Sequence, residues 1–470
     1  MKNQNGATPR PGFTRREFVH TATAAGLLVA VPAWAQDLSK NQEAQNPPGA
    51  QEPPETQPTS QNVAELKVAL LGAGSQGRGA LMNFCLKIPG TRFVAVCDIW
   101  PYHQRYASNI LKKYDQAVNV YADYREMLDQ ERDLDAVLVA TPDWMHAEHS
   151  IACLRAGKHV YCEKEMSNTI EDARRMVHAS RETGKLLQIG HQRRSQPRYW
   201  HALKMIEKDK ILGRLTHCYG QWNRARMLEQ GWPQGEVLDG ETLKRYGYDS
   251  MEELRNWRWY RKYSGGPIAD LGSHQIDVFN WFLRAKPRVV LASGGLDYYT
   301  NEPGRDWYDN ILTIYEYETE LGPARAFYEV LNTTSYGGFY EQFMGDEGSL
   351  VISDDGHTGQ IFREVAAKRR EWEDEAAKVE SMGREAIELK IGETLTPEGK
   401  KDPEGQRLAA EGQKDSRQLH LENFFSAIRD GKPLNCPAEL AFEVCVAVLR
   451  ANESVDTKER VEFRPQEFVA

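Results

Sequence analysis

Two short stretches carry residue types suited to acid–base chemistry. Cys162-Glu163-Lys164-Glu165 ends an apolar segment, and Asp270 and His274 follow Gly265-Gly266-Pro267, where proline suits the first turn of a helix. Residues at i and i+4 share a helix face, so a carboxylate at 270 would lie beside the imidazole, raise its pKa and hold its orientation. This spacing suits a general base that takes the proton of a hydroxyl as a hydride leaves the carbon.

A third stretch has the pattern of a dinucleotide-binding turn. The glycines of Gly72-Ala73-Gly74-Ser75-Gln76-Gly77 permit a tight turn, a close approach of the pyrophosphate and close packing of the following helix, whose N-terminus binds phosphates. Asp98 lies 21 residues after Gly77, where its carboxylate would bind ribose hydroxyls and repel a 2′-phosphate. We therefore expect NAD rather than NADP, held by Gly72, Gly74, Ser75, Gln76, Gly77 and Asp98.

Short apolar segments that alternate with helical ones must position these residues. The expected strands are 66–71, 91–97, 135–140, 159–162 and 185–189. Such alternation predicts a parallel, doubly wound sheet of the α/β class. Because ligands bind at the carboxyl ends of parallel strands, Lys164 is expected near the nicotinamide.

The pattern changes after Gly190. Partly alternating segments at 215–223, 288–297, 310–318, 324–332, 340–344 and 349–353 predict an α+β domain with a large, mostly antiparallel open sheet. We interpret 354–415 as a surface insertion and its charged run, 368–371, as a solvated helix face. Helices at 419–429 and 438–451 are expected to close the domain.

Several motifs in order carry a resemblance to a known family. They are the turn at 72–77, Thr141-Pro142-Asp143 with His146, the run 156–164, the run 190–194, Asp270 with His274, and the run 420–425. Together they resemble the glucose–fructose oxidoreductase, inositol dehydrogenase and rhizopine-catabolism (Gfo/Idh/MocA) family, over roughly residues 66–352 and 417–460.

The resemblance implies a Rossmann domain at 64–190, a substrate and oligomerisation domain at 191–470, and a sugar or polyol substrate. It maps the catalytic set onto Lys164, Asp270 and His274. Further cofactor contacts are expected from Thr141, Pro142, His146, Glu163 and Lys164, and substrate contacts from His191, Arg193, Arg194, Asp270 and His274.

One position departs from the family pattern, which commonly has proline where this chain has Glu165. Either the loop at Lys164 differs or it tolerates a costly cis peptide bond. Simpler interpretations stay open as well. In these, Lys164 is a solvated lysine at the end of a strand, and Asp270 and His274 form an exposed pair on a helix. The aromatic and basic run 256–263 either lines a sugar cleft or packs its rings in the core or at an interface. No metal is expected, since His146 and His149 match no zinc motif.

The N-terminus resembles a twin-arginine signal peptide over 1–35. Arg15-Arg16 and Phe18 precede a short apolar run and Ala33-Trp34-Ala35, which predicts export to the periplasm. Residues 36–63 are rich in proline and glutamine and are expected to be a disordered linker or an arm. Free nicotinamide is not expected outside the inner membrane, so the NAD would have to be tightly bound and recycled in place.

Composition limits the partners. The net charge of −9, with scattered basic residues, argues against nucleic acid, and no segment of the mature chain is apolar enough to span a membrane. The odd count of seven cysteines argues against a disulfide framework. An open sheet favours a homodimer or homotetramer.

The sequence thus predicts an exported NAD-dependent oxidoreductase acting on a hydroxyl of a sugar, polyol or glycoside. Two alternatives stay open: a redox-neutral NAD-dependent glycoside hydrolase or lyase, and a non-catalytic sugar-binding protein.

Overall fold

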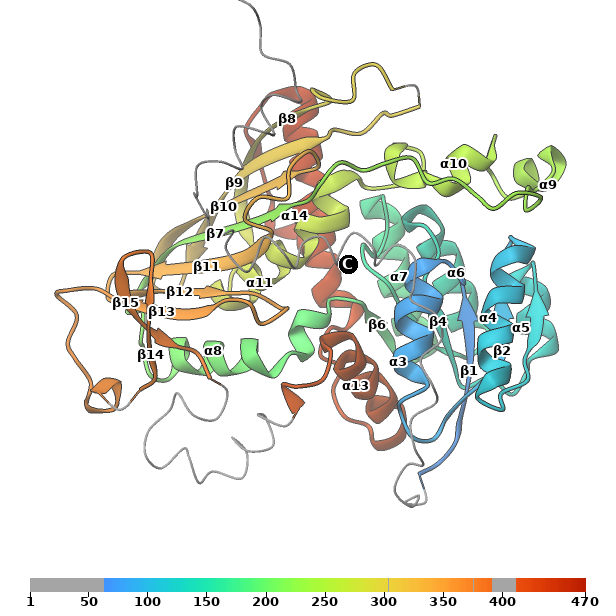
Figure 1. Cartoon of the computed structure of the whole chain (residues 1–470), viewed down its shortest axis with the longest axis horizontal. Coiled ribbons are helices and arrows are strands. Elements are labelled where there is room, and N and C mark those ends of the chain that lie inside the picture. The colour runs from blue at the N-terminus through green and yellow to red at the C-terminus, as the bar shows by residue number, and fades with distance from the viewer. Residues whose placement is uncertain (1–62, 303, 375, 391–410) are drawn as a thin grey trace, which may run out of the picture. The chain divides into compact units, whose positions relative to one another are not determined.

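The computed structural model describes residues 63–302, 304–374, 376–390 and 411–470 (Figure 1). The expected signal peptide and the linker, apart from Val63, lie outside the described residues, as do 391–410 of the expected insertion. Within the described ranges, no helix has the length and apolar character needed to cross a membrane.

The first domain is built on a six-stranded parallel sheet in the order β3-β2-β1-β4-β5-β6. Its strands are β1 (Leu66–Leu71), β2 (Thr91–Cys97), β3 (Asn119–Tyr121), β4 (Ala136–Val139), β5 (His159–Cys162) and β6 (Leu187–Ile189). The strand order reverses direction between β1 and β4, which is where doubly wound sheets bind ligands. The predicted doubly wound sheet is confirmed; the short β3, which is largely exposed, was not predicted.

Helices cover both faces of this sheet, which explains why its central strands are apolar along their whole length. One face packs against α3 (Asn83–Cys85), α4 (Pro101–Lys113) and α13 (Ser416–Asp430). The other face packs against α5 (Tyr124–Gln130), α6 (Asp143–Arg155) and α7 (Ile170–Thr183). Along β1, Val68 and Leu70 face the first group, and Ala69 and Leu71 face the second.

The second domain contains a ten-stranded sheet in the order β14-β15-β13-β12-β11-β7-β10-β9-β8-β16. Among the described strands of this sheet, only β7 and β10 pair in parallel, so the predicted open, mostly antiparallel sheet is confirmed. Its strands are β7 (Leu215–Asn223), β8 (Pro287–Gly295), β9 (Asn310–Thr319), β10 (Gly322–Leu331), β11 (Phe339–Gly345), β12 (Gly348–Ile352), β13 (Gly359–Arg363), β14 (Lys378–Ser381), β15 (Arg384–Glu388) and β16 (Val461–Glu462).

Helices α11 (Ser273–Leu283) and α14 (Ala438–Thr457) pack against one face of this sheet. Tyr315 and Ala326 are fully buried on that side. On the opposite side, Leu291, Leu312 and Phe327 are 46%, 46% and 37% exposed, an unusual amount for large apolar residues on central strands. The two sheets therefore differ, since only the first has both faces covered within the described chain.

The segment 354–390 differs from our expectation. It contributes β13, β14 and β15 to one end of the second sheet, with Ile361 and Ile387 buried. The charged run 368–371 precedes or begins the short 3-10 turn η6 (Glu371–Asp374), and our prediction of a solvated α-helix face there was wrong. Charge density alone did not distinguish a helix from the turns of an antiparallel meander.

Residues 224–263 leave the second sheet and reach the first domain. They include α9 (Gly240–Arg245) and α10 (Met251–Arg255), which run alongside the first domain in Figure 1. Leu238, Tyr248 and Met251 share an apolar cluster with Trp100, whose Nε1 donates to the Glu236 carbonyl at 2.9 Å. This bridging segment, 224–263, ties the second domain to the residues that follow β2.

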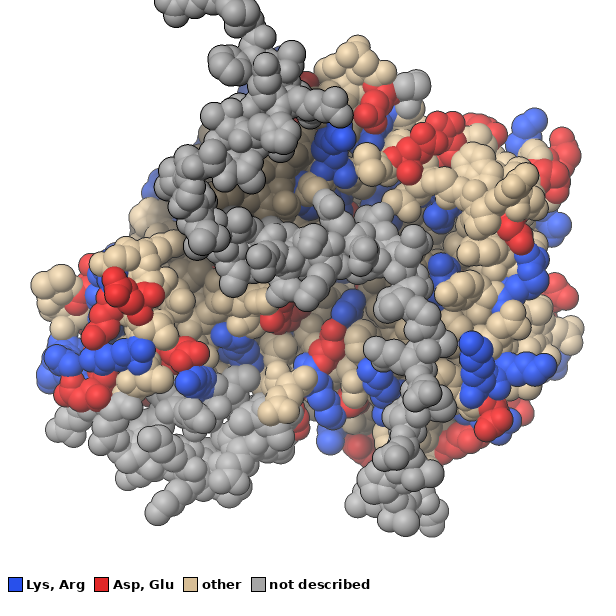
Figure 2. Space-filling model, viewed as in Figure 1, with Lys and Arg blue, Asp and Glu red and all other residues tan. Residues whose placement is uncertain are grey.

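Acidic and basic side chains are interspersed over the described part of the face seen in Figure 2. All seven cysteines are buried free thiols.

Candidate active site

The glycine turn lies between β1 and the π-helical segment η2 (Gly77–Met82). Gly72 adopts φ +92°, and a Cβ at Gly77 would lie 1.9 Å from the Gly72 carbonyl oxygen, so both positions require glycine. At Gly74, by contrast, the nearest atom to an added Cβ would be His103 Cε1, at 3.9 Å. The turn is therefore tightly closed on its inner side and open beside Gly74, where a ligand backbone can approach.

Asp98 follows β2 and holds this turn in place. Its Oδ2 accepts from the Ala73 amide at 2.7 Å and lies 3.2 Å from His103 Nδ1, while its Oδ1 accepts from the Trp100 amide at 2.8 Å. Burial opposes ionisation, but His103 and these amides lower the pKa of Asp98 below its usual value. The carboxylate is thus ionised beside the turn, as the predicted ribose contact requires.

The end of β5 brings Glu163 and Lys164 to the same edge. Gln76 Nε2 donates to Glu163 Oε1 at 2.9 Å, which joins the glycine turn to this strand end. The peptide bond between Lys164 and Glu165 is cis, although residue 165 is not proline.

His146 lies on α6 and connects two loops of the first domain. Its Nδ1 is 2.7 Å from the Glu165 carbonyl oxygen and its Nε2 is 2.6 Å from that of Thr141. His149 Nδ1 is 3.0 Å from Thr141 Oγ1, and Pro142 caps the start of α6. Both ring nitrogens of His146 are therefore engaged by the backbone, so the residue positions the loops at 141 and 165 rather than presenting a free nitrogen to a ligand.

Asp270 and His274 come from the second domain. Asp270 lies in the π-helical segment η5 (Ile268–Gly272) and His274 at the start of α11. The wider π turn changes the i,i+4 relation on which our prediction rested. No hydrogen bond joins Asp270 to His274 in the described structure, so the predicted carboxylate–imidazole pair was wrong.

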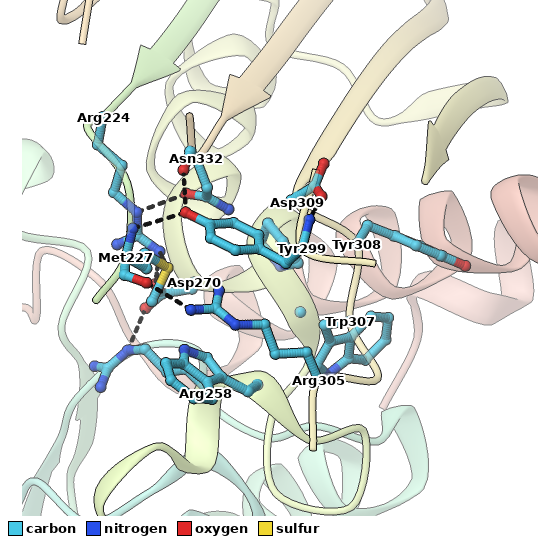
Figure 3. Close-up of a pocket in the computed structure, with 13 residues that line it drawn as sticks. Arg224, Met227, Arg258, Asp270, Tyr299, Arg305, Trp307, Tyr308, Asp309 and Asn332 are labelled. Atoms are coloured by element: carbon cyan, nitrogen blue, oxygen red, sulfur yellow. Dashed lines mark hydrogen bonds and ion pairs between the residues drawn. The ribbon is translucent and has the colours of Figure 1, made fainter. Parts of the chain in front are cut away.

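Three cations surround the Asp270 carboxylate, and Figure 3 shows two of them, Arg224 and Arg258. Arg258 Nε lies 3.1 Å from Oδ1, Arg224 Nη2 lies 3.3 Å from Oδ2, and Lys164 Nζ lies 3.7 Å from Oδ1. Lys164 also donates to the Asp270 backbone carbonyl. Burial alone would raise the pKa of Asp270, but Arg258, Lys164 and Arg224 together hold it well below its usual value. These contacts bring Lys164 of the first domain against Asp270 of the second.

His274 is 5% exposed, and its buried Nδ1 lacks a hydrogen-bond partner among the described residues. Its ring stacks on Trp222, with centroids 5.6 Å apart, and lies 6.2 Å from the ring of His191. Burial, then Lys164, Arg193 and His191, lower the pKa of His274 well below its usual value, which is opposite to our prediction. His191 is likewise buried, with both ring nitrogens unpartnered, and burial lowers its pKa to about 4. Buried ring nitrogens without partners mark a site suited to a polar ligand.

Arg193 and Arg194 are deeply buried in ion pairs. Arg193 Nη1 lies 2.5 Å from Glu341 Oε1, and Arg194 Nη2 lies 2.7 Å from Asp277 Oδ1. Although burial opposes the charged form, Glu341 raises the pKa of Arg193. Since both guanidinium groups are paired, their contact with a substrate stays a prediction.

A pocket lies beside Asp270, and the residues that line it all belong to the second domain (Figure 3). Its wall includes three arginines and several rings: Arg224, Arg258, Arg305, Trp259, Tyr299 and Trp307. The run 256–263 had suggested a sugar cleft, and Arg258 and Trp259 do line this pocket. Sequence reasoning missed Arg224 and Arg305; the only signal for Arg224 was its place directly after a predicted strand. Within the described chain, no cluster of three metal-ligating side chains occurs.

Comparison with known proteins identifies both domains. A family model described as "Oxidoreductase family, NAD-binding Rossmann fold" matches residues 66–191, and one described as "Oxidoreductase family, C-terminal alpha/beta domain" matches 233–463.

Curated relatives include inositol 2-dehydrogenase of Salmonella typhimurium, 30% identical over 227 residues, 48% of this chain and 56% of that protein. Another is scyllo-inositol 2-dehydrogenase (NAD(+)) of Bacillus subtilis, 25% identical over 61% of this chain and 74% of that protein. The chain spans little more than half the length of the first of these.

Solved structures share the fold at low identity. A levoglucosan dehydrogenase in complex with NADH and L-sorbose matches with a TM-score of 0.63 and 19% identity, covering 86% of this chain and all of that one. Aldose-aldose oxidoreductase from Caulobacter crescentus matches with a TM-score of 0.62 and 18% identity, over 85% and 100% of the two chains. Together with the family models, these matches confirm the predicted resemblance: the chain belongs to the Gfo/Idh/MocA oxidoreductase family.

Proposed function

We propose that this protein is an NAD-dependent oxidoreductase that acts on a hydroxyl of a sugar, polyol or glycoside. The observation that carries the proposal is that Lys164 Nζ lies 3.7 Å from Asp270 Oδ1, near His274, whose buried Nδ1 has no partner among the described residues. Lys164 closes a strand of the nucleotide-binding sheet, and the other two residues come from the second domain. The inositol dehydrogenases among the relatives support a polyhydroxylated substrate.

The glycine turn fits a dinucleotide. The open space beside Gly74 suits a pyrophosphate, and the ionised Asp98 at the end of β2 suits ribose hydroxyls. Gln76, Thr141, Glu163 and Lys164 lie on the same strand-end edge. When bound, NAD supplies a hydride acceptor for the carbinol carbon. Its preference over NADP is part of the proposal.

His274, Lys164 and Asp270 have separate roles in the proposed reaction. A lowered pKa keeps His274 neutral near pH 7, so its imidazole is free to accept the hydroxyl proton. Lys164 donates a hydrogen bond to the reacting oxygen and stabilises developing negative charge. Asp270 holds Lys164 in position and leaves His274 unpaired, which replaces the orienting role we first expected.

We also propose export by the twin-arginine route, with the cofactor retained and recycled. Arg15-Arg16 and the following apolar run support export. The bridging segment 224–263 supports retention, because its contacts with Trp100 lie two residues from Asp98. Replacing Arg15 and Arg16 by lysine should abolish periplasmic accumulation; unchanged export would refute the route.

The oxidoreductase proposal is tested with protein purified without added cofactor. Denaturation should release near-stoichiometric NAD, and mass spectrometry after incubation with sugars, polyols and glycosides should find keto products. A cleaved glycoside without net cofactor reduction would instead indicate the redox-neutral hydrolase or lyase. Protein without nicotinamide that binds sugars unchanged would indicate a binding protein.

The exposed apolar side of the second sheet supports a homodimer or homotetramer. Leu291, Leu312 and Phe327 lie on neighbouring strands β8, β9 and β10, and burial of such a patch favours association. Sedimentation at micromolar concentration should give an oligomer, and Leu312→Glu should shift it toward monomer. A monomeric wild type would refute the assembly.

A further inference from the structure

The group of cations around Asp270 is out of charge balance. Lys164, Arg224 and Arg258 all lie within 4 Å of one carboxylate, which can neutralise only one of them. Asp309, the other acid in the pocket wall, is held by its own loop: its Oδ2 accepts from the Tyr298 and Tyr299 amides at 2.7 and 3.2 Å. The cations within 4 Å of Asp270 therefore outnumber the carboxylates of the pocket wall that pair with them.

The excess charge comes with unused hydrogen-bond donors. Arg258 uses Nε for Asp270, and no described residue accepts from its two terminal nitrogens. Its guanidinium packs over the Trp257 ring at 4.1 Å, which fixes the plane of the group. A planar guanidinium with two adjacent free N–H groups matches two oxygens of one anion.

The rest of the wall is rigid. Arg305 lies between the rings of Trp259 and Tyr299, at 3.8 and 3.6 Å, and donates to the Met227 carbonyl at 2.5 Å. The Trp307 indole nitrogen donates to the Ser264 carbonyl at 3.0 Å. These residues are held by protein partners, so Arg258 is the wall residue best able to take up a ligand.

We propose that the substrate is a sugar acid, and that Arg258 binds its carboxylate in this pocket while the hydroxyl to be oxidised lies at Lys164 and His274. The inference rests on the proposed oxidoreductase function and names its substrate class. We propose a carboxylate because its two oxygens lie in one plane and match the two adjacent N–H groups of the Arg258 guanidinium, and the 6-phosphates serve as the competing anion in the test.

The test compares matched substrates: methyl glycosides of several hexoses, the corresponding methyl uronosides, and the corresponding 6-phosphates. For each, binding is measured by calorimetry and turnover by the keto product. The wild type should prefer uronosides to their neutral parents by at least about tenfold. Arg258→Gln should weaken uronoside binding roughly 10- to 100-fold more than it weakens binding of the neutral parents, and mainly in KM. Arg258→Lys should fall between, since it keeps the charge but loses the paired donors.

Arg226→Gln is the matched control, because Arg226 is exposed on the same segment and donates to Tyr298 outside the pocket. It should leave the preference unchanged. Equal or weaker binding of every uronoside relative to its parent, a preference for the phosphates, or an equal loss on all substrates in Arg258→Gln would overturn the proposal. Oxidation of neutral glycosides alone would refute only the sugar-acid inference, whereas no oxidation together with no bound nicotinamide would refute the oxidoreductase itself.

Discussion

The second domain holds two kinds of buried carboxylate–arginine group, and they differ in charge balance. Arg193 with Glu341 and Arg194 with Asp277 are one-to-one pairs, with side chains between 0% and 9% exposed. Asp270 faces three cations, of which Arg224 is 28% and Arg258 42% exposed. The balanced pairs are sealed from solvent, whereas the unbalanced group borders a pocket.

This difference distinguishes the ion pairs that stabilise the fold from the charged group that can take part in catalysis. A buried ion pair whose partners satisfy each other leaves little to offer a ligand, and its main effect is on stability when one partner is removed. Surplus cations around a carboxylate leave donors free, and one of them, Lys164, adds to the effect of burial in lowering the pKa of His274. Variants in the two groups should therefore affect different measurements.

The largest expected effect is on turnover in the unbalanced group. His274→Ala should lower kcat by roughly 10²–10⁴, the usual range for loss of a general base, without changing the nicotinamide content. His201→Ala is the control, because His201 is also buried with a pKa lowered to about 4 but lies on α8 (Pro197–Glu207), outside the site. Near-normal turnover in His274→Ala would move the proton acceptor elsewhere.

Variants of the balanced Arg193–Glu341 pair should change the free energy of unfolding rather than turnover. Glu341→Gln leaves the Arg193 charge buried without a counter-ion and also alters the acceptor of Tyr199 Oη at 2.5 Å. We expect a loss of about 3–5 kcal/mol in the free energy of unfolding, measured by urea titration. The folded fraction should keep wild-type KM.

Replacing both partners, as in Arg193→Met with Glu341→Leu, should recover much of the stability. If Glu341→Gln unfolds normally but raises KM, Arg193 binds substrate, as we first expected, and the division between the two groups fails.

Glu165 extends the comparison to a buried carboxyl without a hydrogen-bonded cation. Its Oε1 accepts from the Met166 amide at 2.7 Å and its Oε2 is unpartnered, and burial raises its pKa to about 8 from 4.5. The folded state then holds a proton that the unfolded state has lost. This contribution to stability is complete below pH 4.5 and is lost as the pH rises through 8.

The stability of the wild type relative to Glu165→Gln should therefore fall by about 1.5 kcal/mol between pH 6.5 and 8. Buried histidines such as His149 and His191, whose pKa values are lowered to about 3 and 4, gain stability as the pH rises through 6.5 and oppose the fall, so the comparison with the variant is what isolates Glu165. A difference between the two proteins that does not change with pH would show that Glu165 does not titrate in this way.

Much of the fold followed from local patterns. β1, β2, β5 and β7 have the predicted bounds, because apolar runs end at glycine or polar residues there. The short β3 and the strands β13 to β15 were missed, since they are brief, contain few apolar residues and are stabilised mainly by pairing with neighbours. Pairing across distant segments leaves little trace in the sequence itself.

The sequence predicted which residues form the site better than it predicted the contacts between them. Lys164, Asp270 and His274 do lie together, but the π-helical turn at 268–272 separated the carboxylate from the imidazole. Arg224 and Arg305 approach Asp270 from other elements, so no spacing rule connects them. The Asp98 prediction required only that β2 be recognised as a strand and its end located, and it can be tested independently of the other site residues.

Asp98 is a fourth case, a carboxylate whose partners are backbone amides and His103 rather than arginine. Asp98→Asn keeps the shape of the side chain and removes its charge, so hydrogen bonds to ribose hydroxyls weaken and repulsion of a 2′-phosphate disappears. We expect about tenfold weaker NAD binding and a comparable gain for NADP, measured by reconstitution of cofactor-stripped protein. Asp129→Asn, exposed on α5, is the control. Because this change is only about 1.4 kcal/mol, it is the smallest of the four effects. A wild type that prefers NADP, or a variant with unchanged preference, would show that Asp98 serves only to hold the glycine turn.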